Sequence, residues 1–219
     1  MLNVVNDQLV VEEKGIYSVE KFLVARRLMY WQVYLHKTGV AAEQLLIRVL
    51  QRAKEIIENG EDLTCSPALS YFLNNKVTLD TFDSAILKTF AKLDDYDIIS
   101  AMKLWLSHED FVLSNLCEML LNRNLLKVKL KKKPIPSDRL EKHILKLQKK
   151  YDISKAEASY FVFSGEISNV AYSSEGDKIQ IVHRNGKTSD VAKASDQLNL
   201  KALSKEVTKY YICYPKTKD

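Results

Sequence analysis

The chain has 219 residues, of which 46% are hydrophobic and 28% are charged, so it can bury a sizeable core. Only six Gly and four Pro argue against linkers, collagen-like segments and a turn-rich all-β fold. No apolar run approaches the ~20 residues of a membrane span, and the early acidic residues Asp7, Glu12 and Glu13 do not fit a signal peptide.

The three cysteines are odd in number and far apart, at Cys65, Cys117 and Cys213. This usage is typical of a reducing compartment and excludes CxxC zinc or redox motifs. We therefore expect a cytoplasmic protein without a membrane partner.

The net charge of +5 is unevenly placed. Residues 127–150, called the basic stripe below, hold ten basic and two acidic residues, a balance of +8, which leaves −3 for the remainder. Such a stripe could bind phosphates or an acidic partner. The alternative is a solvated face of a strand and a helix.

The first part of the chain is predicted to be helical. A short hairpin is expected over 2–13 with a turn at Asn6-Asp7, and a helix follows from Ser18 to Lys37. That helix carries two apolar stripes, so we expect it to be a central helix that is buried over most of its circumference. Further helices are expected at 40–58, which Asn59-Gly60 ends, and at 67–74, 79–92, 95–107 and 109–123.

The pattern changes at Leu125. Residues 126–130 alternate like a strand, and Ser137 is expected to cap an amphipathic helix over 138–151. Strand-like runs follow at 160–163, 178–183 and 209–214, with turn signals at 175–176 and 185–186. The predicted fold class is mainly α: a helical body of about six helices over 1–124, then a small α+β lobe with a short antiparallel sheet over 125–219.

Motifs for autonomous catalysis are absent from the sequence. The four histidines form no HExxH and no His-Asp pair, and there is no GxSxG, GxGxxG or GxxxxGK[ST] pattern. Without a usable cluster of metal ligands, the chain by itself is predicted to be inactive in metal-dependent hydrolysis.

One face of the helix expected over 18–37 carries polar groups. Arg26, Tyr30, Tyr34 and Lys37 fall at i, i+4, i+8 and i+11. An arginine fork and a lysine suit phosphate oxygens, and tyrosine rings can line a sugar or base. The alternative is that these groups pair with carboxylates such as Glu20 or Glu43.

The run F-L-V-A-R-R-L-M-Y-W-Q-V-Y-L-H-K-T over 22–38 closely resembles a helix of the HD-domain phosphohydrolases, which include deoxynucleoside triphosphate triphosphohydrolases. Weaker matching pieces lie at 93–98, 123–127 and 209–214. The resemblance implies that Arg26 contacts the terminal phosphate of a nucleotide and that Tyr34 packs beside the deoxyribose. It also implies an effector pocket between subunits, lined by His36, Lys37, Arg123 and Lys127. At the position of Leu35, the nucleotide-activated members of the family have a glutamine that contacts the base. Leu35 differs from this pattern.

The family's metal ligands, a His, a His-Asp pair and a further Asp, lie upstream of the matching segment and are missing here. The resemblance therefore implies the C-terminal portion of a nucleotide phosphohydrolase that lacks its metal centre, as a fragment or as a naturally split product. We expect no cofactor in this chain, a transition metal or Mg²⁺ in the full-length protein, a deoxynucleotide ligand and a homo-oligomer.

The alternative is a non-catalytic regulatory or assembly module. Its basic stripe would bind a nucleotide effector, nucleic acid or an acidic partner. Aromatic residues are sparse in the stripe, with only Tyr151 at its end, so a stacking platform for single strands is poorly supported.

Overall fold

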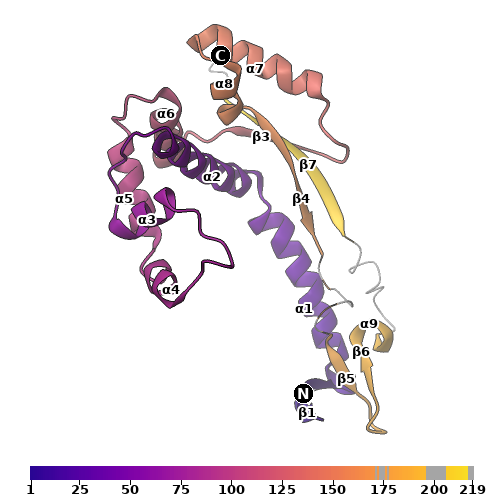
Figure 1. Ribbon diagram of the computed structural model, residues 1–219. Helices are drawn as coiled ribbons and strands as arrows, with labels where there is room; N and C mark the ends of the chain where they lie inside the picture. The colour runs from indigo at the N-terminus through magenta and orange to yellow at the C-terminus, as the bar shows by residue number, and fades with distance from the viewer. Residues whose placement is uncertain (171, 173–175, 177, 196–205, 217–219) are drawn as a thin grey trace. The chain divides into compact units, whose positions relative to one another are not determined.

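The computed structural model describes residues 1–170, 172, 176, 178–195 and 206–216 (Figure 1). The chain divides into two compact units. The first contains Met1–His36, Leu130–Pro134 and Gly165–Tyr211, and the second contains Lys37–Lys129, Ile135–Ser164 and Ile212–Asp219. Both units contain residues from either side of residue 124, so neither unit ends at the predicted domain boundary. That boundary stays a prediction.

The first unit begins with the expected hairpin. Strands β1 (Leu2–Val5) and β2 (Gln8–Glu12) pair antiparallel around Asn6 and Asp7, whose φ angles are 51° and 59°. Asparagine and aspartate tolerate this left-handed conformation, which two-residue hairpin turns require. β2 pairs in parallel with β5 (Gln180–Val182), and β5 pairs antiparallel with β6 (Thr188–Asp190), so the sheet order is β1-β2-β5-β6.

Helices and the sheet both contribute to the core of the unit. The 3-10 turn η1 (Glu13–Gly15) leads into α1 (Ile16–Met29) and the π-helix η2 (Tyr30–Tyr34), while α9 (Val191–Ala194) follows β6. Removal of their apolar surface from water stabilises the unit. The buried core residues are Ile16, Leu23, Tyr172, Ile181 and Val191.

The second unit contains most of the helices. They are α2 (Lys37–Glu58), α3 (Pro67–Asn74), α4 (Ser84–Phe90), α5 (Asp95–Trp105), α6 (Phe111–Leu121), α7 (Ser137–Tyr151) and α8 (Lys155–Phe161). α2 packs on α3 and α6, and its buried residues recur at spacings of three and four. Gly60, with φ of +92°, ends it as expected.

Aspartate caps set several helix starts. The Asp83 carboxylate accepts hydrogen bonds from the N–H groups of Ala85 and Ile86, so α4 begins at Ser84 rather than at the expected Leu79. Asp94 and Asp110 cap α5 and α6 in the same way. Each cap satisfies N–H groups that would otherwise lack a partner in the first helical turn.

A second sheet has the strand order β3-β7-β4. Its strands are β3 (Lys127–Lys131), β7 (Val207–Tyr214) and β4 (Phe163–Asn169). The predicted mainly α class with a small sheet component is confirmed, with nine α-helices among the described residues. No helix in that part of the chain is long and apolar enough to cross a membrane.

Two local predictions differ from the structure, and a third falls partly outside the described residues. The strand expected at 160–163 is wrong, because Ser154 and Glu157 form a capping box that starts α8, and β4 begins only at Phe163. Ser137 is the first residue of α7 and not its cap, since Pro136 occupies that position without a side-chain hydrogen bond. The turn expected at 175–176 falls partly on Glu175, outside the described residues.

Candidate functional site

Arg26, Tyr30 and Tyr34 form a ladder along α1 and η2. The Arg26 guanidinium carbon lies 5.4 Å from the centroid of the Tyr30 ring, and the Tyr30 and Tyr34 centroids are 5.2 Å apart with their planes tilted by 50°. The shared face predicted for these three residues is therefore present. Cation–π attraction orients the guanidinium while its N–H donors stay available. Tyr34 is 61% exposed, so the end of the ladder faces solvent.

The ladder runs into a π-helical turn that nothing in the sequence signals. The Leu35 N–H donates to the Tyr30 carbonyl at 2.7 Å, an i to i+5 bond, and the His36 N–H donates to the Val33 carbonyl at 3.3 Å. A single helix to Lys37 was expected. Instead it ends at this wide turn, and Lys37 opens α2 in the second unit. π-turns are frequent at functional sites.

The prediction that this helix is buried over most of its circumference is wrong. In α1 only Ile16, Glu20 and Leu23 are buried, and η2 has no buried residue. The double apolar stripe identifies side chains that favour removal from water, but it does not identify the surface that covers them. In α1 and η2 the large apolar side chains that are 47–61% exposed are Phe22, Leu28, Met29, Val33 and Tyr34.

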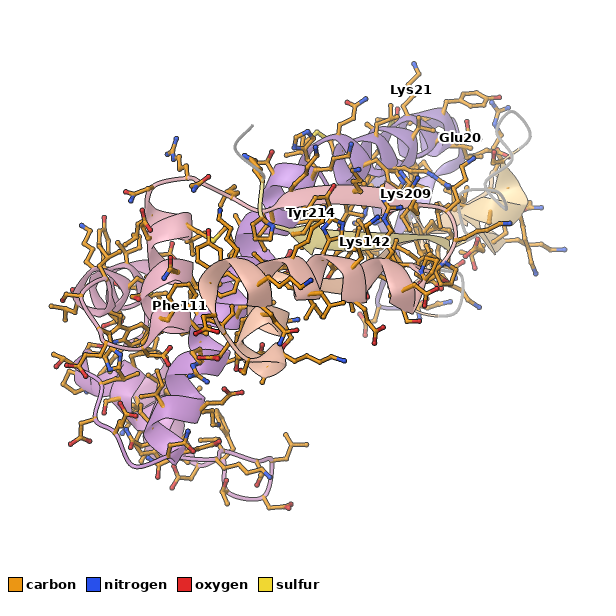
Figure 2. All side chains as sticks on the ribbon, turned by 90° about the horizontal axis from the view of Figure 1, so that it is seen from above. Glu20, Lys21, Phe111, Lys142, Lys209 and Tyr214 are labelled. Atoms are coloured by element: carbon orange, nitrogen blue, oxygen red, sulfur yellow. The ribbon has the colours of Figure 1, made fainter. Side chains whose placement is uncertain are left out.

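Glu20 and Trp31 contact residues of the first unit that are distant in the sequence. The buried Glu20 carboxylate accepts a hydrogen bond from the Ser195 hydroxyl, and Glu20 is labelled with its exposed neighbour Lys21 in Figure 2. The Lys209 ammonium lies 3.8 Å from the centroid of the Trp31 ring. These contacts attach α1 and η2 to segments near the other end of the chain.

The residues predicted to bind an effector divide between the two units. His36 is exposed after η2 in the first unit, whereas Lys37, Arg123 and Lys127 belong to the second. Arg123 follows α6 with φ of 55°, and Lys127 is the exposed first residue of β3. The predicted effector site therefore stays a prediction.

Sequence reasoning missed an ionic network in the second unit. Arg52 Nε donates to Asp110 Oδ1 at 3.1 Å, and Arg52 also pairs with Glu55 at 3.1 Å. Burial opposes ionisation of Asp110, but hydrogen bonds from Arg52 and from the Leu113 N–H hold its pKa below the usual range. Because Asp110 also caps α6, we interpret this network as structural.

A second unforeseen group links distant segments of the first unit. His183 Nδ1 lies 2.9 Å from Glu13 Oε1, and its Nε2 lies 2.8 Å from Ser189 Oγ. The hydrogen bond from His183 lowers the pKa of Glu13. No sequence pattern joins residues that are 170 positions apart.

The described part of the chain contains no group of three or more His, Cys, Asp or Glu residues that could hold a metal ion. The resemblance places the family's metal ligands upstream of the matching segment, and that expectation stays a prediction.

Comparison with known proteins supports an HD-related protein. Residues 1–65 match the family described as HD associated region. A phosphohydrolase crystal structure from Bacteroides thetaiotaomicron is 47% identical with a TM-score of 0.88, over 99% of this chain and 54% of that one. A hypothetical protein from Aquifex aeolicus is 20% identical with a TM-score of 0.56, over 98% of this chain and 46% of that one, and shows the fold alone.

Curated relatives are longer than this chain. The uncharacterized protein YwfO of Bacillus subtilis is 36% identical over 120 residues, which are 54% of this chain and 26% of that protein. The uncharacterized MG461 homolog of Mycoplasma pneumoniae is 28% identical over 131 residues, 54% of this chain and 31% of that protein. The chain thus spans about half of the solved phosphohydrolase and less than a third of these two curated relatives. The family match and the structural match together suggest a relationship to the HD superfamily.

Proposed function

We propose that this chain is the C-terminal portion of a nucleotide phosphohydrolase of the HD superfamily, which hydrolyses a deoxynucleoside triphosphate. In this proposal it supplies contacts to the substrate's phosphate and sugar and a surface for oligomerisation, while a companion region supplies the metal centre. The observation that carries the proposal is the exposed ladder of Arg26, Tyr30 and Tyr34 on an uncovered apolar helix.

The ladder has the chemistry for a phosphate and a sugar side by side. The Arg26 fork donates several N–H groups to phosphate oxygens, and its contact with Tyr30 reduces the freedom lost on binding. The exposed Tyr34 ring offers an apolar face to a deoxyribose, and its hydroxyl offers a hydrogen bond. The attack of metal-activated water on the ester would take place on the companion region.

The exposed apolar side chains support the proposal that a companion region covers this helix. Phe22, Met29 and Val33 are each about half exposed, and such a patch is typical of an interaction surface. The solved phosphohydrolase is nearly twice as long as the segment that this chain matches. A region corresponding to its remaining part is the proposed occupant.

Complementation tests the proposal. The chain is combined with the part of the solved relative that it does not match, which is the proposed source of the metal centre, and triphosphate release from dGTP is measured. Arg26→Ala is expected to lower kcat/KM by about 10- to 100-fold, because a hydrogen bond to a charged group contributes ~1.5–3 kcal/mol. Lys21→Ala removes an exposed charge from the same helix and is the matched control. Equal turnover of wild type and Arg26→Ala in an active complex would exclude the assigned role.

A second variant separates assembly from substrate contact. Val33→Asp places a charge on the exposed patch and is expected to weaken binding of the companion half by at least tenfold, with the melting temperature of the chain alone unchanged. Unchanged affinity in a calorimetric titration would show that the companion half does not cover this patch.

A further inference from the structure

The outer face of α7 carries a row of positive charges. Arg139, Lys142, Lys146 and Lys149, called the α7 basic face below, recur at i, i+3, i+7 and i+10. At a rise of ~1.5 Å per residue this row extends over about 15 Å. The opposite face of α7 buries Ile144 and Leu147, so packing of the helix turns the charges toward solvent.

The two carboxylates beside this row form no ion pair with its lysines within the described part of the chain. The acidic neighbour Glu141 pairs with Lys155 at 3.6 Å, and Asp138 accepts a hydrogen bond from Ser137. Lys142, Lys146 and Lys149 have no ion pair among the described residues. Together with Asp138, Glu141 and Leu145 they line a shallow hollow of about 390 Å³ on the helix surface, in which the three lysines outnumber the two carboxylates.

A further cation from β3 joins the row. His143 stacks on Tyr214, with ring centroids 4.1 Å apart, and the Lys129 ammonium lies 5.7 Å from the centroid of the same Tyr214 ring. Figure 2 labels Tyr214 and Lys142 in this region. Burial and surrounding positive charge hold the pKa of His143 below its usual range; the cations responsible are Lys146, Arg139, Lys129 and Lys142. The charges thus converge on one surface.

We propose that the α7 basic face, together with Lys129, binds the phosphodiester backbone of duplex nucleic acid without sequence preference. A row of unpaired cations along ~15 Å matches a polyanion better than a single small anion. Binding releases the counterions condensed on the duplex, which drives association.

The types of residue favour nucleic acid over an acidic protein. Four of the five cations are lysines, which bind phosphates as point charges without the fixed bidentate geometry of an arginine fork, and this suits contact with a backbone of any sequence. Lysine is also depleted in interfaces between proteins. A duplex is favoured over a single strand, because the Tyr214 ring is buried and Tyr151, which is 45% exposed at the end of α7, is a single ring rather than a row of rings for base stacking.

Salt-dependent binding tests the proposal. Fluorescence anisotropy measures binding of two unrelated 20-base-pair duplexes by wild type and by Lys142→Ala/Lys146→Ala/Lys149→Ala. Each lost phosphate contact is expected to reduce the slope of log K against log salt by ~0.9, so the triple variant loses about 2.7. Between about 50 and 200 mM salt, wild-type affinity then falls roughly 40-fold more than that of the variant.

The matched control is Lys88→Ala/Lys92→Ala/Lys103→Ala, which removes three exposed lysines from other parts of the same unit. This control variant is expected to retain the wild-type slope of log K against log salt. An equal loss of slope in both triple variants would overturn the assigned surface. Absence of duplex binding at low salt, or tighter binding of a glutamate-rich peptide of equal charge, would overturn the assigned partner.

Discussion

Asp110 gives the sharpest test of how the second unit is held together. Its carboxylate accepts the Leu113 N–H at 2.7 Å as the cap of α6, and it accepts Arg52 Nε at 3.1 Å from α2. The side chains of Arg52 and Asp110 are only 19% and 16% exposed. Asp110→Ala therefore removes a helix cap and leaves a partly buried guanidinium without its main partner.

The expected loss can be worked out from these contacts. An absent aspartate cap costs ~1 kcal/mol, and hydrogen bonds to a charged group contribute ~1.5–3 kcal/mol. Glu55 still pairs with Arg52, so we take the lower half of that range. The free energy of unfolding is expected to fall by about 3 kcal/mol, which lowers the melting temperature by roughly 6–12 °C in a chain of this size.

Urea unfolding followed by circular dichroism measures this loss. Asp110→Asn keeps the oxygen that accepts the Leu113 N–H but loses the charge, so it is expected to cost about 2 kcal/mol. Glu55→Ala, at the 48% exposed partner, is expected to cost less than ~0.5 kcal/mol. A loss below ~1 kcal/mol in Asp110→Ala would refute the assignment of this network as a stabilising element.

The pH dependence of the same pair has a definite sign. The folded pKa of Asp110 is lowered, so its contribution is complete above the unfolded pKa of about 3.9 and is lost as the pH falls through the folded value. The difference in stability between wild type and Asp110→Asn is therefore expected to shrink as the pH falls below about 4. A difference that stays constant from pH 7 to pH 3 would contradict the charge assignment.

Three further outcomes are expected. Burial raises the pKa values of Cys117 and Cys213 to about 12. Iodoacetamide at pH 8 should therefore label the less buried Cys65 first and all three cysteines only in urea. Equal labelling rates of the three cysteines in the folded protein would contradict this. Gly60→Ala should cost about 1 kcal/mol in urea unfolding, because φ is +92° there although a Cβ would meet no atom. Trp105→Phe should cost about 2 kcal/mol, since it empties core volume and removes the donor to the Thr64 carbonyl, and an unchanged urea midpoint would exclude that contribution.

Local signals in the sequence were sufficient for many elements of the fold. α3 spans the expected Pro67–Asn74, and the turn at Asn6-Asp7 forms the expected hairpin. Helix periodicity also placed Arg26, Tyr30 and Tyr34 on one face, because residues four apart are neighbours on a helix. In each case the physical cause acts within a few residues of the chain.

Other features were not predicted from the sequence, for different reasons. The capping box at Ser154 and Glu157 is a local signal, but the apolar run that follows it is also typical of a strand, and a strand was predicted where α8 ends. The bond between His183 and Glu13 joins segments 170 positions apart, and no periodicity carries that information. The π-turn at Tyr30–Tyr34 has no Pro or Gly to indicate it.

The sequence by itself determined which face of α1 and η2 holds the polar ladder, because that follows from helix geometry. Tertiary structure alone decided that Phe22, Met29 and Val33 lie exposed beside it. An apolar pattern reports a preference for leaving water, whereas burial requires a neighbouring surface, and only the folded chain shows where that surface is present.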